Sequence, residues 1–279
     1  MVLTIVYVAV FFAYSLGLLV YFSFRDYNIV EQTNRFIGLQ NYVPLLTKPE
    51  YLDIIGRTFL YTGVVNIASL GVGLGMALLV ESIRSKRISI PLRTVLMFPM
   101  FLIPVAGGIV WRYLLLERYG WINFLIEALG GQRYSWLSDP HYAFWLVCLT
   151  DVWGWSPFLF LILLAGIETI PTDLFEACDI DGASSWSKFR HITIPLLKPI
   201  IYIAMTIKLL DTYKAFDYLW VMTHGGPGNT SMTLNIEGYL VAFGSGTLDI
   251  GFGSAIGVLT MLFPFLLVMI LLIVRRRRG

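Results

Sequence analysis

The sequence contains six apolar runs, each long enough to cross a lipid bilayer as a helix, and this pattern limits the possible folds most strongly. A hydrocarbon core about 30 Å thick needs about 20 mostly apolar residues per spanning helix. We place the runs at Val2–Phe24, Thr58–Val80, Pro91–Leu114, Tyr142–Ala165, Pro199–Met222 and Phe252–Val274. A spanning barrel would instead show short segments of alternating polarity. The runs therefore predict an all-α polytopic membrane protein with six transmembrane helices.

Composition agrees with a chain that lies mostly in lipid. Of its 279 residues, 57% are hydrophobic and 14% are charged, whereas soluble domains carry about 25% charged residues. Pro99, Pro104 and Pro157 fall inside the expected spans, where proline bends a helix. The net charge of +2 reflects the Lys and Arg residues that flank the spans and set the membrane topology. It gives no sign of nucleic-acid binding, so no nucleic-acid partner is expected.

The positions of Lys and Arg predict orientation, because both gather in cytoplasmic segments. With the amino terminus inside, the cytoplasmic segments hold the larger set: Arg84, Lys86, Arg87, Arg93, Lys188, Arg190, Lys198 and Arg275–Arg278. The external segments are longer and hold fewer: Arg25, Arg35, Lys48, Arg57, Arg112, Arg118 and Arg133. We therefore expect both termini in the cytoplasm. The expected parts are a first span with an external segment (1–57), a five-helix core (58–274) with a cytoplasmic loop (166–198), and a basic cytoplasmic tail (275–279).

The first half of the cytoplasmic loop has the signals of a short helix that ends at a sharp turn. Thr172 or Asp173 can cap the helix, and Glu176 stands in capping-box position three residues after Asp173. Gly182 follows where a helix ends in the left-handed conformation, which glycine adopts without steric cost. A helix over these residues is therefore predicted to end at Gly182.

The second half of the loop leads into the fifth run. Ser184 or Ser185 can start a second short helix, and proline is tolerated in the first turn of a helix, where Pro195 falls. Together the two halves predict a compact knob that projects from the membrane surface. An amphipathic loop lying on the lipid headgroups is the alternative that periodicity alone leaves open.

Ionisable residues stand at successive i+3 spacings in the fifth run: Lys208, Asp211, Lys214 and Asp217. Such groups inside a span usually face the bundle interior or a water-filled cavity and pair with one another. A substrate pathway and a set of structural ion pairs both explain them. Polar and aromatic residues nearby extend the candidate set to Asp151, Trp153, Trp155 and Trp220. This mixture suits a sugar, although an interfacial aromatic belt explains the tryptophans equally well.

The cytoplasmic loop resembles the EAA loop of ATP-binding-cassette (ABC) importer permeases. In that pattern a glycine follows Glu-Ala-Ala at a fixed distance, and an Ile-x-Leu-Pro sequence lies beyond it. The residues at the corresponding positions are Glu176, Ala177, Cys178, Asp181, Gly182, Ala183, Ile192 and Pro195. Cys178 replaces the second alanine and Ile194 replaces the usual leucine, so both departures conserve size. The resemblance implies that this loop couples the chain to a separate ATPase.

A second resemblance lies after the fifth run, where Thr223–Gly228 reads Thr-His-Gly-Gly-Pro-Gly. Consecutive glycine and proline residues form a tight turn, here Gly225, Gly226, Pro227 and Gly228. A loop of this kind after a Phe-Asp pair resembles the carbohydrate-uptake branch of these permeases, and within it the subunit type of the maltose and glycerol-3-phosphate systems. The external segment 36–42, Phe-Ile-Gly-Leu-Gln-Asn-Tyr, resembles the same branch.

These resemblances imply a type I ABC importer transmembrane domain that forms half of the pathway for a sugar or related polyol. The implied partners are a second related permease in a heterodimer, two ATP-binding subunits and an extracytoplasmic solute-binding protein, at a bacterial-type inner membrane. The sequence has no Gly-x-x-x-x-Gly-Lys-Ser/Thr phosphate loop, so the chain itself is not expected to be an ATPase. ATP and Mg²⁺ would be used by the partner, and no cofactor is expected on this chain.

Three other classes of protein remain as alternatives. An uncoupled channel or structural subunit is the first, and it would leave the predicted knob without a role. An ion-coupled secondary transporter would use the Lys208–Asp217 row as a relay and would work without ATP. An intramembrane enzyme would need a nucleophile with its base, or a set of metal ligands, within the spans. His141, His191 and His224 all lie at span ends or in loops, and no metal site is expected.

Overall fold

The computed structural model describes residues 2–278 except 84, 245 and 247, and it describes the side chains of 4–266, 268 and 269 within that range. The chain forms two compact units. The terminal unit combines the residues up to Leu60 with those from Tyr213 onward, and the central unit is Tyr61–Thr212. For the predicted basic tail, Gly279 and the side chains of Arg275–Arg278 lie outside the described residues.

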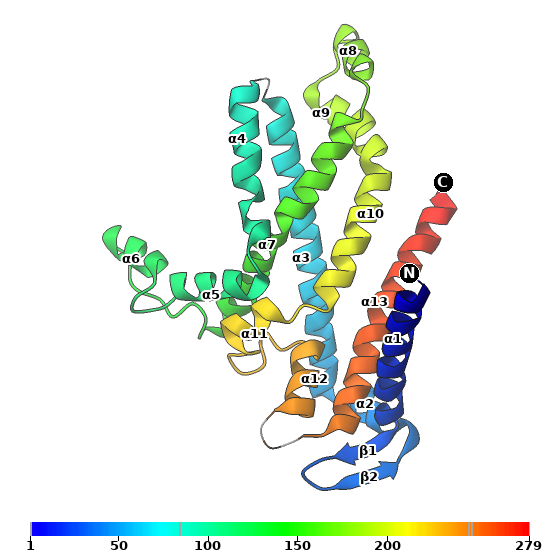
Figure 1. The fold of residues 1–279 in the computed structure, drawn as a ribbon. Coiled ribbons are helices and arrows are strands. Elements are labelled where there is room, and N and C mark those ends of the chain that lie inside the picture. Colours follow the sequence, from blue (N-terminus) through cyan, green and yellow to red (C-terminus); the bar gives the residue numbers. More distant parts are fainter. Residues whose placement is uncertain (1, 84, 245, 247, 279) are drawn as a thin grey trace. The chain divides into compact units, whose positions relative to one another are not determined.

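The terminal unit is built from the two ends of the chain. Helix α13 (Ile250–Arg278) packs against α1 (Val2–Ser23) and against α12 (Leu234–Phe243), as Figure 1 shows. The unit also contains β1 (Arg25–Asn28), β2 (Thr33–Phe36), α2 (Tyr42–Thr47), the start of α3 (Pro49–Ser82) and α11 (Asp217–Thr223). A 3₁₀ turn covers Gly38–Asn41.

An antiparallel hairpin is an exception to the otherwise helical fold. Strands β1 and β2 pair with Arg25 opposite Phe36 and Asn28 opposite Thr33. The carbonyl oxygen of the Asn28 side chain accepts hydrogen bonds from the amides of Val30 (2.8 Å) and Glu31 (3.0 Å). Such Asx turns reverse a chain locally. This side-chain turn starts the reversal that pairs two strands of low hydrophobicity.

The central unit packs its helices around α7 (Pro140–Glu168), which supplies most of the core. Its other elements are the rest of α3, α4 (Lys86–Met97), a 3₁₀ turn (Phe98–Phe101), α5 (Pro104–Leu114), α6 (Trp121–Ala128), α8 (Thr172–Ile180), α9 (Ser185–Lys188), a π-helical turn (Phe189–Thr193) and α10 (Ile194–Tyr213). Leu159, Phe160 and Leu163 are fully buried in the core. A side chain at Gly73 of α3 would meet the Cβ of Leu159 at 2.8 Å, so α3 and α7 approach closely there.

The third predicted span is broken, which corrects the expectation of one bent helix over Pro91–Leu114. Residues Lys86–Phe101 and Pro104–Leu114 form two segments at 97° to each other. Ile103 is extended (ψ 135°) because a following proline disfavours the helical conformation, and Pro104 then begins α5. Pro157, in contrast, lies inside the continuous helix α7.

The fifth predicted span is also interrupted, which corrects the boundary Pro199–Met222. Helix α10 ends at Tyr213, and α11 begins at Asp217. The break frees backbone carbonyl groups that need hydrogen-bond donors. The side-chain amide of Asn235 donates to the carbonyl oxygens of Tyr213 (2.8 Å) and Ala215 (3.4 Å). This donor, 20 residues away in sequence, stabilises an ending that local periodicity does not reveal.

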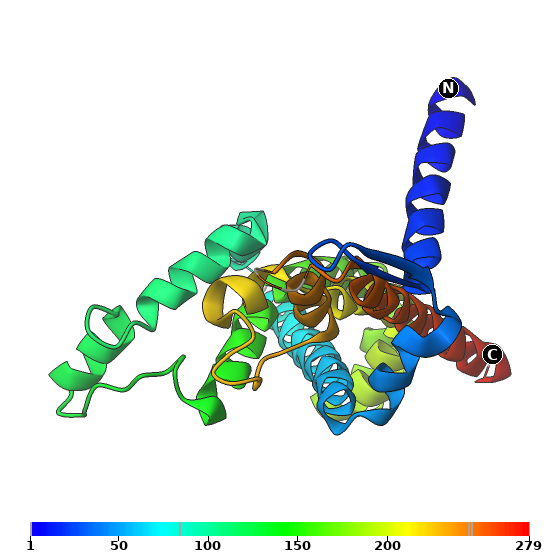
Figure 2. The same ribbon diagram turned by 90° about the horizontal axis from the view of Figure 1, so that it is seen from below.

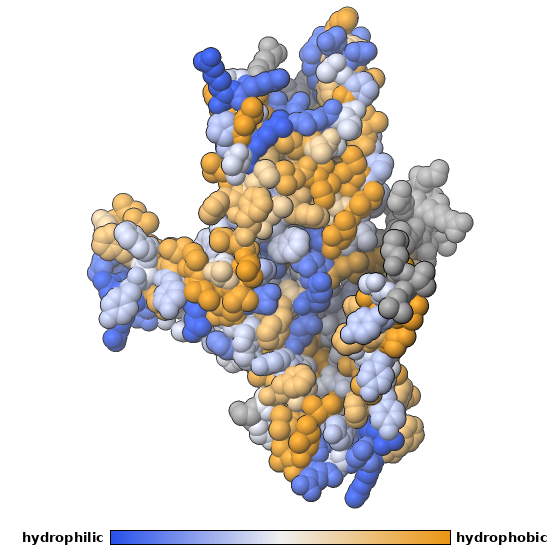
Figure 3. Space-filling view, viewed as in Figure 1, coloured by the Kyte–Doolittle hydropathy of each residue, from blue (hydrophilic) through white to orange (hydrophobic). Residues whose placement is uncertain are grey.

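Four helices in the described residues are long and apolar enough to cross a membrane, and the broken α4–α5 pair makes a possible fifth. They are Thr4–Ser23, Pro49–Ser82, Pro140–Glu168 and Ser185–Tyr213. The apolar part of α13 that can be assessed, Ile250–Leu266, is shorter. On the face seen in Figure 3, hydrophobic side chains form a band below the hydrophilic residues at the tips of α4 and α8. The count of six spans and the position of both termini stay predictions, as does the division of the chain at 57 and 274.

Candidate functional site: an exposed loop and a buried polar network

The turn predicted at Gly182 is confirmed. Gly182 has a φ of +69°, and the hydrogen bonds around it close the end of α8. The amide of Ala183 donates to the carbonyl oxygen of Cys178 at 2.9 Å, and the amide of Gly182 donates to that of Asp179 at 3.1 Å. This pair of bonds is the Schellman motif, in which the left-handed residue is usually glycine. The motif sets the direction in which the chain leaves α8.

The start of α8 differs from the sequence expectation. Pro171 occupies the N-cap position, and no side chain caps the helix. Thr172 and Asp173 therefore lie inside the first turn, and the expected capping box with Glu176 does not form. Asp173 still places a negative charge at the positive end of the helix dipole. The second helix begins as predicted, because Ser184 Oγ accepts a hydrogen bond from the amide of Ser187 at 3.2 Å.

The loop α8–α9 exposes apolar side chains. Neither helix has a buried residue, and Ile180 is 88% and Trp186 66% exposed. An ion pair between Lys188 and Asp179 joins the two helices. The eight candidate coupling residues all lie here or in the entry to α10: Glu176, Ala177, Asp181, Gly182 and Pro195 are exposed, and Cys178, Ala183 and Ile192 are half-buried. We call residues Thr172–Lys188 the coupling knob, after the role predicted for this loop from the sequence.

A second set of candidates meets in the interior of the central unit. Lys208 Nζ of α10 lies 2.8 Å from Asp151 Oδ1 of α7. The hydroxyl of Tyr61 on α3 donates to Asp151 Oδ2 at 2.5 Å. Lys208 Nζ also lies 4.6 Å from the ring centroid of Trp155, a cation–π distance. Lys208, Tyr61 and Asp151 are 0%, 1% and 2% exposed. This buried polar network joins three helices through complementary charges and hydrogen bonds.

The network changes the interpretation of the charged row. Lys208 and Asp211 lie on α10, Lys214 follows its end, and Asp217 is the first residue of α11. The break between the two helices interrupts the i+3 spacing, so the four residues do not form one continuous helical row. Lys208 instead meets Asp151, which sequence placed only in the same general region. Tyr61 was missed, because a tyrosine in an apolar run gives no sign of its partner.

The candidate tryptophans separate into three environments. Trp155 lies in the network, whereas Trp153 packs edge-on against Trp111 with 5.8 Å between ring centroids. Trp220, in the terminal unit, stacks on Phe216 at 5.4 Å and packs edge-on against Tyr239 at 5.1 Å. We call Phe216, Trp220 and Tyr239 the Trp220 cluster, which offers aromatic faces. Of these three, the sequence had placed only Trp220 in the candidate set.

The predicted glycine-rich turn is present and firmly held. Gly225 and Gly228 have φ values of +86° and +58°. Ser231 Oγ donates to the carbonyl oxygen of Gly226 at 2.7 Å and lies 2.7 Å from Thr223 Oγ1. The guanidinium of Arg57 donates to the backbone of this loop at Asn229. Among the described residues, no group of three or more His, Cys, Asp and Glu side chains could hold a metal ion.

Comparison with known proteins gives consistent matches along most of the chain. Residues 69–278 match the family described as "Binding-protein-dependent transport system inner membrane component". The sequence is 36% identical over 248 residues to the sulfoquinovosyl glycerol transport system permease protein SmoG of Agrobacterium fabrum, covering 88% of this chain and 79% of that protein. It is 34% identical over 258 residues to the trehalose/maltose transport system permease protein MalF of Thermococcus litoralis, covering 91% and 83%.

A solved structure has the same fold at low sequence identity. It is a crystal structure of a bacterial ABC transporter involved in the import of the acidic polysaccharide alginate. The match has a TM-score of 0.85 at 21% identity and covers 98% of this chain and 92% of that one. The overall fold of this chain is therefore one already known from experiment.

Proposed function

The chain belongs to the family of binding-protein-dependent transport system inner membrane components, and from that premise we propose that it forms half of a carbohydrate pathway. It is a permease subunit of an ABC importer, with the fold of an ABC importer transmembrane domain. Relatives at 36% and 34% identity are named for sulfoquinovosyl glycerol and for trehalose and maltose. These names support a sugar or a sugar derivative as the transported class.

The coupling knob carries the proposal for energy transfer. It exposes Ile180 and Trp186 on a loop whose direction is set by Gly182. Exposed apolar groups on a rigid projection suit a cleft in a partner protein. In the proposed mechanism, ATP-driven closure of two ATP-binding subunits moves the knobs of two permease chains together, and the attached α7 and α10 then reorient. ATP and Mg²⁺ act in those subunits.

The buried polar network is proposed to border the pathway. Ionisable groups in apolar helices are expensive unless paired, and they often mark a route for polar solutes. Asp151 and Lys208 offer hydrogen-bonding groups, and the ring of Trp155 offers an apolar face for the C–H groups of a sugar. The Trp220 cluster and the glycine-rich turn are proposed as parts of the external entrance.

The proposed assembly has six spans in this chain, both termini in the cytoplasm and a second, different permease beside it. An extracytoplasmic solute-binding protein would deliver the sugar at the bacterial inner membrane. The helices fit this topology, since the four continuous apolar helices, the broken α4–α5 pair and α13 can together supply six spans. In this arrangement the coupling knob faces the cytoplasm, where the ATP-binding subunits lie.

The experiment that tests the proposal replaces Gly182 in the assembled transporter. Gly182→Val forces a β-branched residue toward a φ of +69°, which L-residues other than Asn and Asp rarely adopt. We expect membrane insertion to persist while uptake and the coupled ATPase activity are lost. Gly182→Asn is the matched control, because asparagine is the next most frequent residue at this helix ending, and it should retain most uptake. Normal uptake by Gly182→Val at normal expression would refute the assigned role.

A further inference from the structure

The segment between α4 and α7 forms an arm that runs nearly perpendicular to α4. Helices α5 and α6 extend away from the rest of the central unit in both Figure 1 and Figure 2. The turn at Pro104, with 97° between the two segments, sets their direction. If α4 and α7 cross the bilayer, an element at 97° to α4 lies roughly along the membrane plane. The arm therefore cannot itself be the second half of a straight span.

The arm and the coupling knob lie at opposite ends of α7. The arm precedes Pro140, and the knob follows Glu168, so 29 helical residues separate them. A helix of that length is about 43 Å long, which exceeds the hydrocarbon core of about 30 Å. The two segments can therefore lie at opposite interfaces of one bilayer. With the knob at the cytoplasmic side, the arm lies at the external side.

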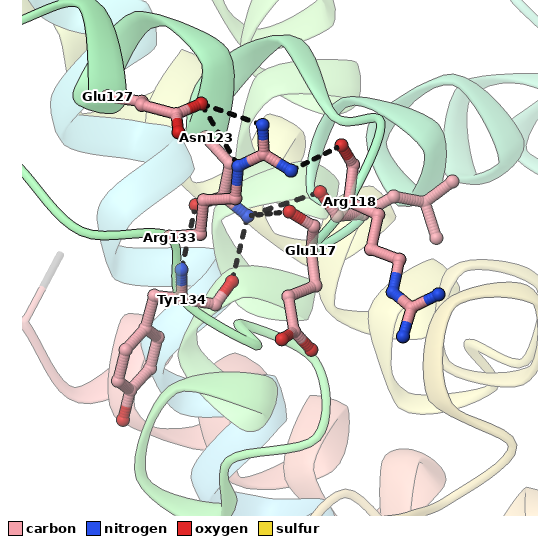
Figure 4. A network of polar contacts seen from close by, with 7 residues as sticks. Glu117, Arg118, Asn123, Glu127, Arg133 and Tyr134 are labelled. Carbon is pink, nitrogen blue, oxygen red and sulfur yellow. Dashed lines mark hydrogen bonds and ion pairs between the residues drawn. The ribbon is translucent and has the colours of Figure 1, made fainter.

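A buried side chain holds the arm in a defined shape, as Figure 4 shows. Asn123 of α6 is 1% exposed. Its amide nitrogen donates to the carbonyl oxygens of Leu116 (3.1 Å), Glu117 (3.2 Å) and Tyr134 (2.8 Å), and its oxygen accepts from the amide of Tyr134 at 3.1 Å. Asn123 thereby joins α6 to the chain before it, at Leu116 and Glu117, and to the chain after it, at Tyr134. These hydrogen bonds fix the orientation of α6 within the arm.

The outer surface of α6 is apolar and uncovered within the described chain. Trp121, Phe124 and Leu125 follow helical i, i+3 and i+4 spacing, and Leu129 is the C-cap residue that follows the helix. Trp121 is 66% and Leu129 88% exposed. Tryptophan, phenylalanine and leucine on one side of a helix, with basic residues nearby, are typical of helices that lie in the membrane interface. Figure 3 shows hydrophobic and hydrophilic residues side by side along this arm.

A pocket of about 400 Å³ opens beside this apolar surface. Its lining combines two guanidinium groups with three aromatic rings: Arg118, Tyr119, Gly120, Trp121, Phe124 and Arg133. Arg133 is held by Glu127, with nitrogen–oxygen distances of 3.0 and 2.7 Å. The Arg118 side chain has no hydrogen-bond or ion-pair partner among the described residues. Figure 4 shows its guanidinium turned away from the contacts of Asn123 and Arg133. Arg118 is thus available to an anion at the pocket.

We propose that α6 anchors the arm in the external membrane interface and that Arg118 binds the phosphate of an anionic phospholipid there. The rings of Tyr119, Trp121 and Phe124 then contact the glycerol and upper acyl region of the same lipid layer. A guanidinium matches a phosphate in both charge and hydrogen-bond geometry. The inference goes beyond sugar transport, since it concerns how the permease is seated in its membrane.

The depth of α6 tests the first half of the proposal. The complete transporter, carrying Leu125→Cys, is spin-labelled and reconstituted in lipid nanodiscs, and the signal of the parent transporter labelled at its own cysteines is subtracted. The label should collide more with oxygen, which partitions into lipid, than with a water-soluble nickel complex. A label at Glu31→Cys in the exposed β1–β2 turn is the control and should show the reverse preference. A water-accessible label at Leu125 that becomes protected only on adding solute-binding protein would overturn the proposal in favour of a protein-docking surface.

The lipid bound at Arg118 tests the second half. Native mass spectrometry of the transporter from nanodiscs containing phosphatidylglycerol measures retained anionic lipid. Arg118→Gln should reduce retention about fivefold, the effect expected of one basic residue near a charged membrane. Lys48→Gln, a basic residue of the terminal unit predicted to be external, should leave retention unchanged. Equal losses in both variants, or none in Arg118→Gln, would overturn the lipid assignment. Uptake driven by ATP in these preparations would leave the proposed function intact in either case.

Discussion

The coupling knob and the buried polar network both depart from the usual placement of side chains. The knob exposes apolar residues, whereas the network buries charged ones. The knob places Ile180 and Trp186 in the open. The network places an ion pair and a tyrosine hydroxyl in the interior. Both belong to the central unit, and α7 leads from one to the other. The central unit thus exposes apolar side chains at the coupling knob and buries charged ones in the polar network.

The difference teaches which region depends on other molecules. In the network, Asp151 receives both a cation and a hydroxyl, so the charges are compensated within the chain. In the knob, the exposed apolar surface has no compensation among the described residues. Substitutions in the network should therefore act on the folded chain itself, whereas substitutions in the knob should act on assembly. Three predictions test this contrast, in order of their expected effect on stability.

The largest effect is expected for Asp151→Ala. This change leaves the Lys208 ammonium buried without its carboxylate, which typically costs about 3 to 5 kcal/mol. We expect a large drop in thermal stability of the purified chain in detergent, followed by fluorescence. The paired variant Asp151→Leu/Lys208→Met is the control, because removing both charges together is often neutral. Equal destabilisation in the single and paired variants would show that packing, and not charge compensation, explains the cost.

A smaller effect is expected for Tyr61→Phe. The variant removes the hydrogen bond to Asp151 while keeping the ring, and hydrogen bonds to charged groups contribute about 1.5 to 3 kcal/mol. Tyr213→Phe is a matched control, because the hydroxyl of Tyr213 is buried with no hydrogen-bond partner in the described structure. Tyr213→Phe should therefore be neutral or stabilising in the same melting assay. If both variants lose equal stability, Tyr61 is not a member of the network.

The smallest effect on the chain is expected for Ile180→Asp. Because Ile180 is 88% exposed, the change in unfolding free energy should stay within about 0.5 kcal/mol. Recovery of ATP-binding subunits with the tagged permease should nevertheless fall sharply, since a charge replaces an apolar contact in the proposed cleft. Ile180→Val keeps the apolar character and should recover the subunits normally. A strongly destabilised Ile180→Asp chain would remove the contrast between knob and network.

Sequence predicted what depends on local chemistry. The left-handed turn at Gly182 and the cap at Ser184 follow from residues within a few positions, and both are confirmed. The break at Ile103–Pro104 was underestimated, because proline in a span can either bend a helix or end it. Whether a proline ends a helix depends on what the next segment contacts.

The sequence did not predict the features that depend on contacts between residues far apart in the chain. Asn235 stabilises the end of α10 from a later helix, and Tyr61 reaches Asp151 across 90 positions. Neither residue has a neighbour in sequence that reveals its partner. The i+3 spacing of the charged row was real in the sequence, but the end of α10 at Tyr213 divides it between two helices.

The division into two units has a consequence for how the protein is made. Helix α1 emerges from the ribosome well before α13, against which it packs, because α13 begins at Ile250. At about 5 to 20 residues per second, α1 waits roughly 10 to 45 seconds in the membrane before α13 is synthesised. The central unit, a continuous stretch, can fold during that interval. Translation order therefore favours a permease whose middle matures first and whose two ends close last.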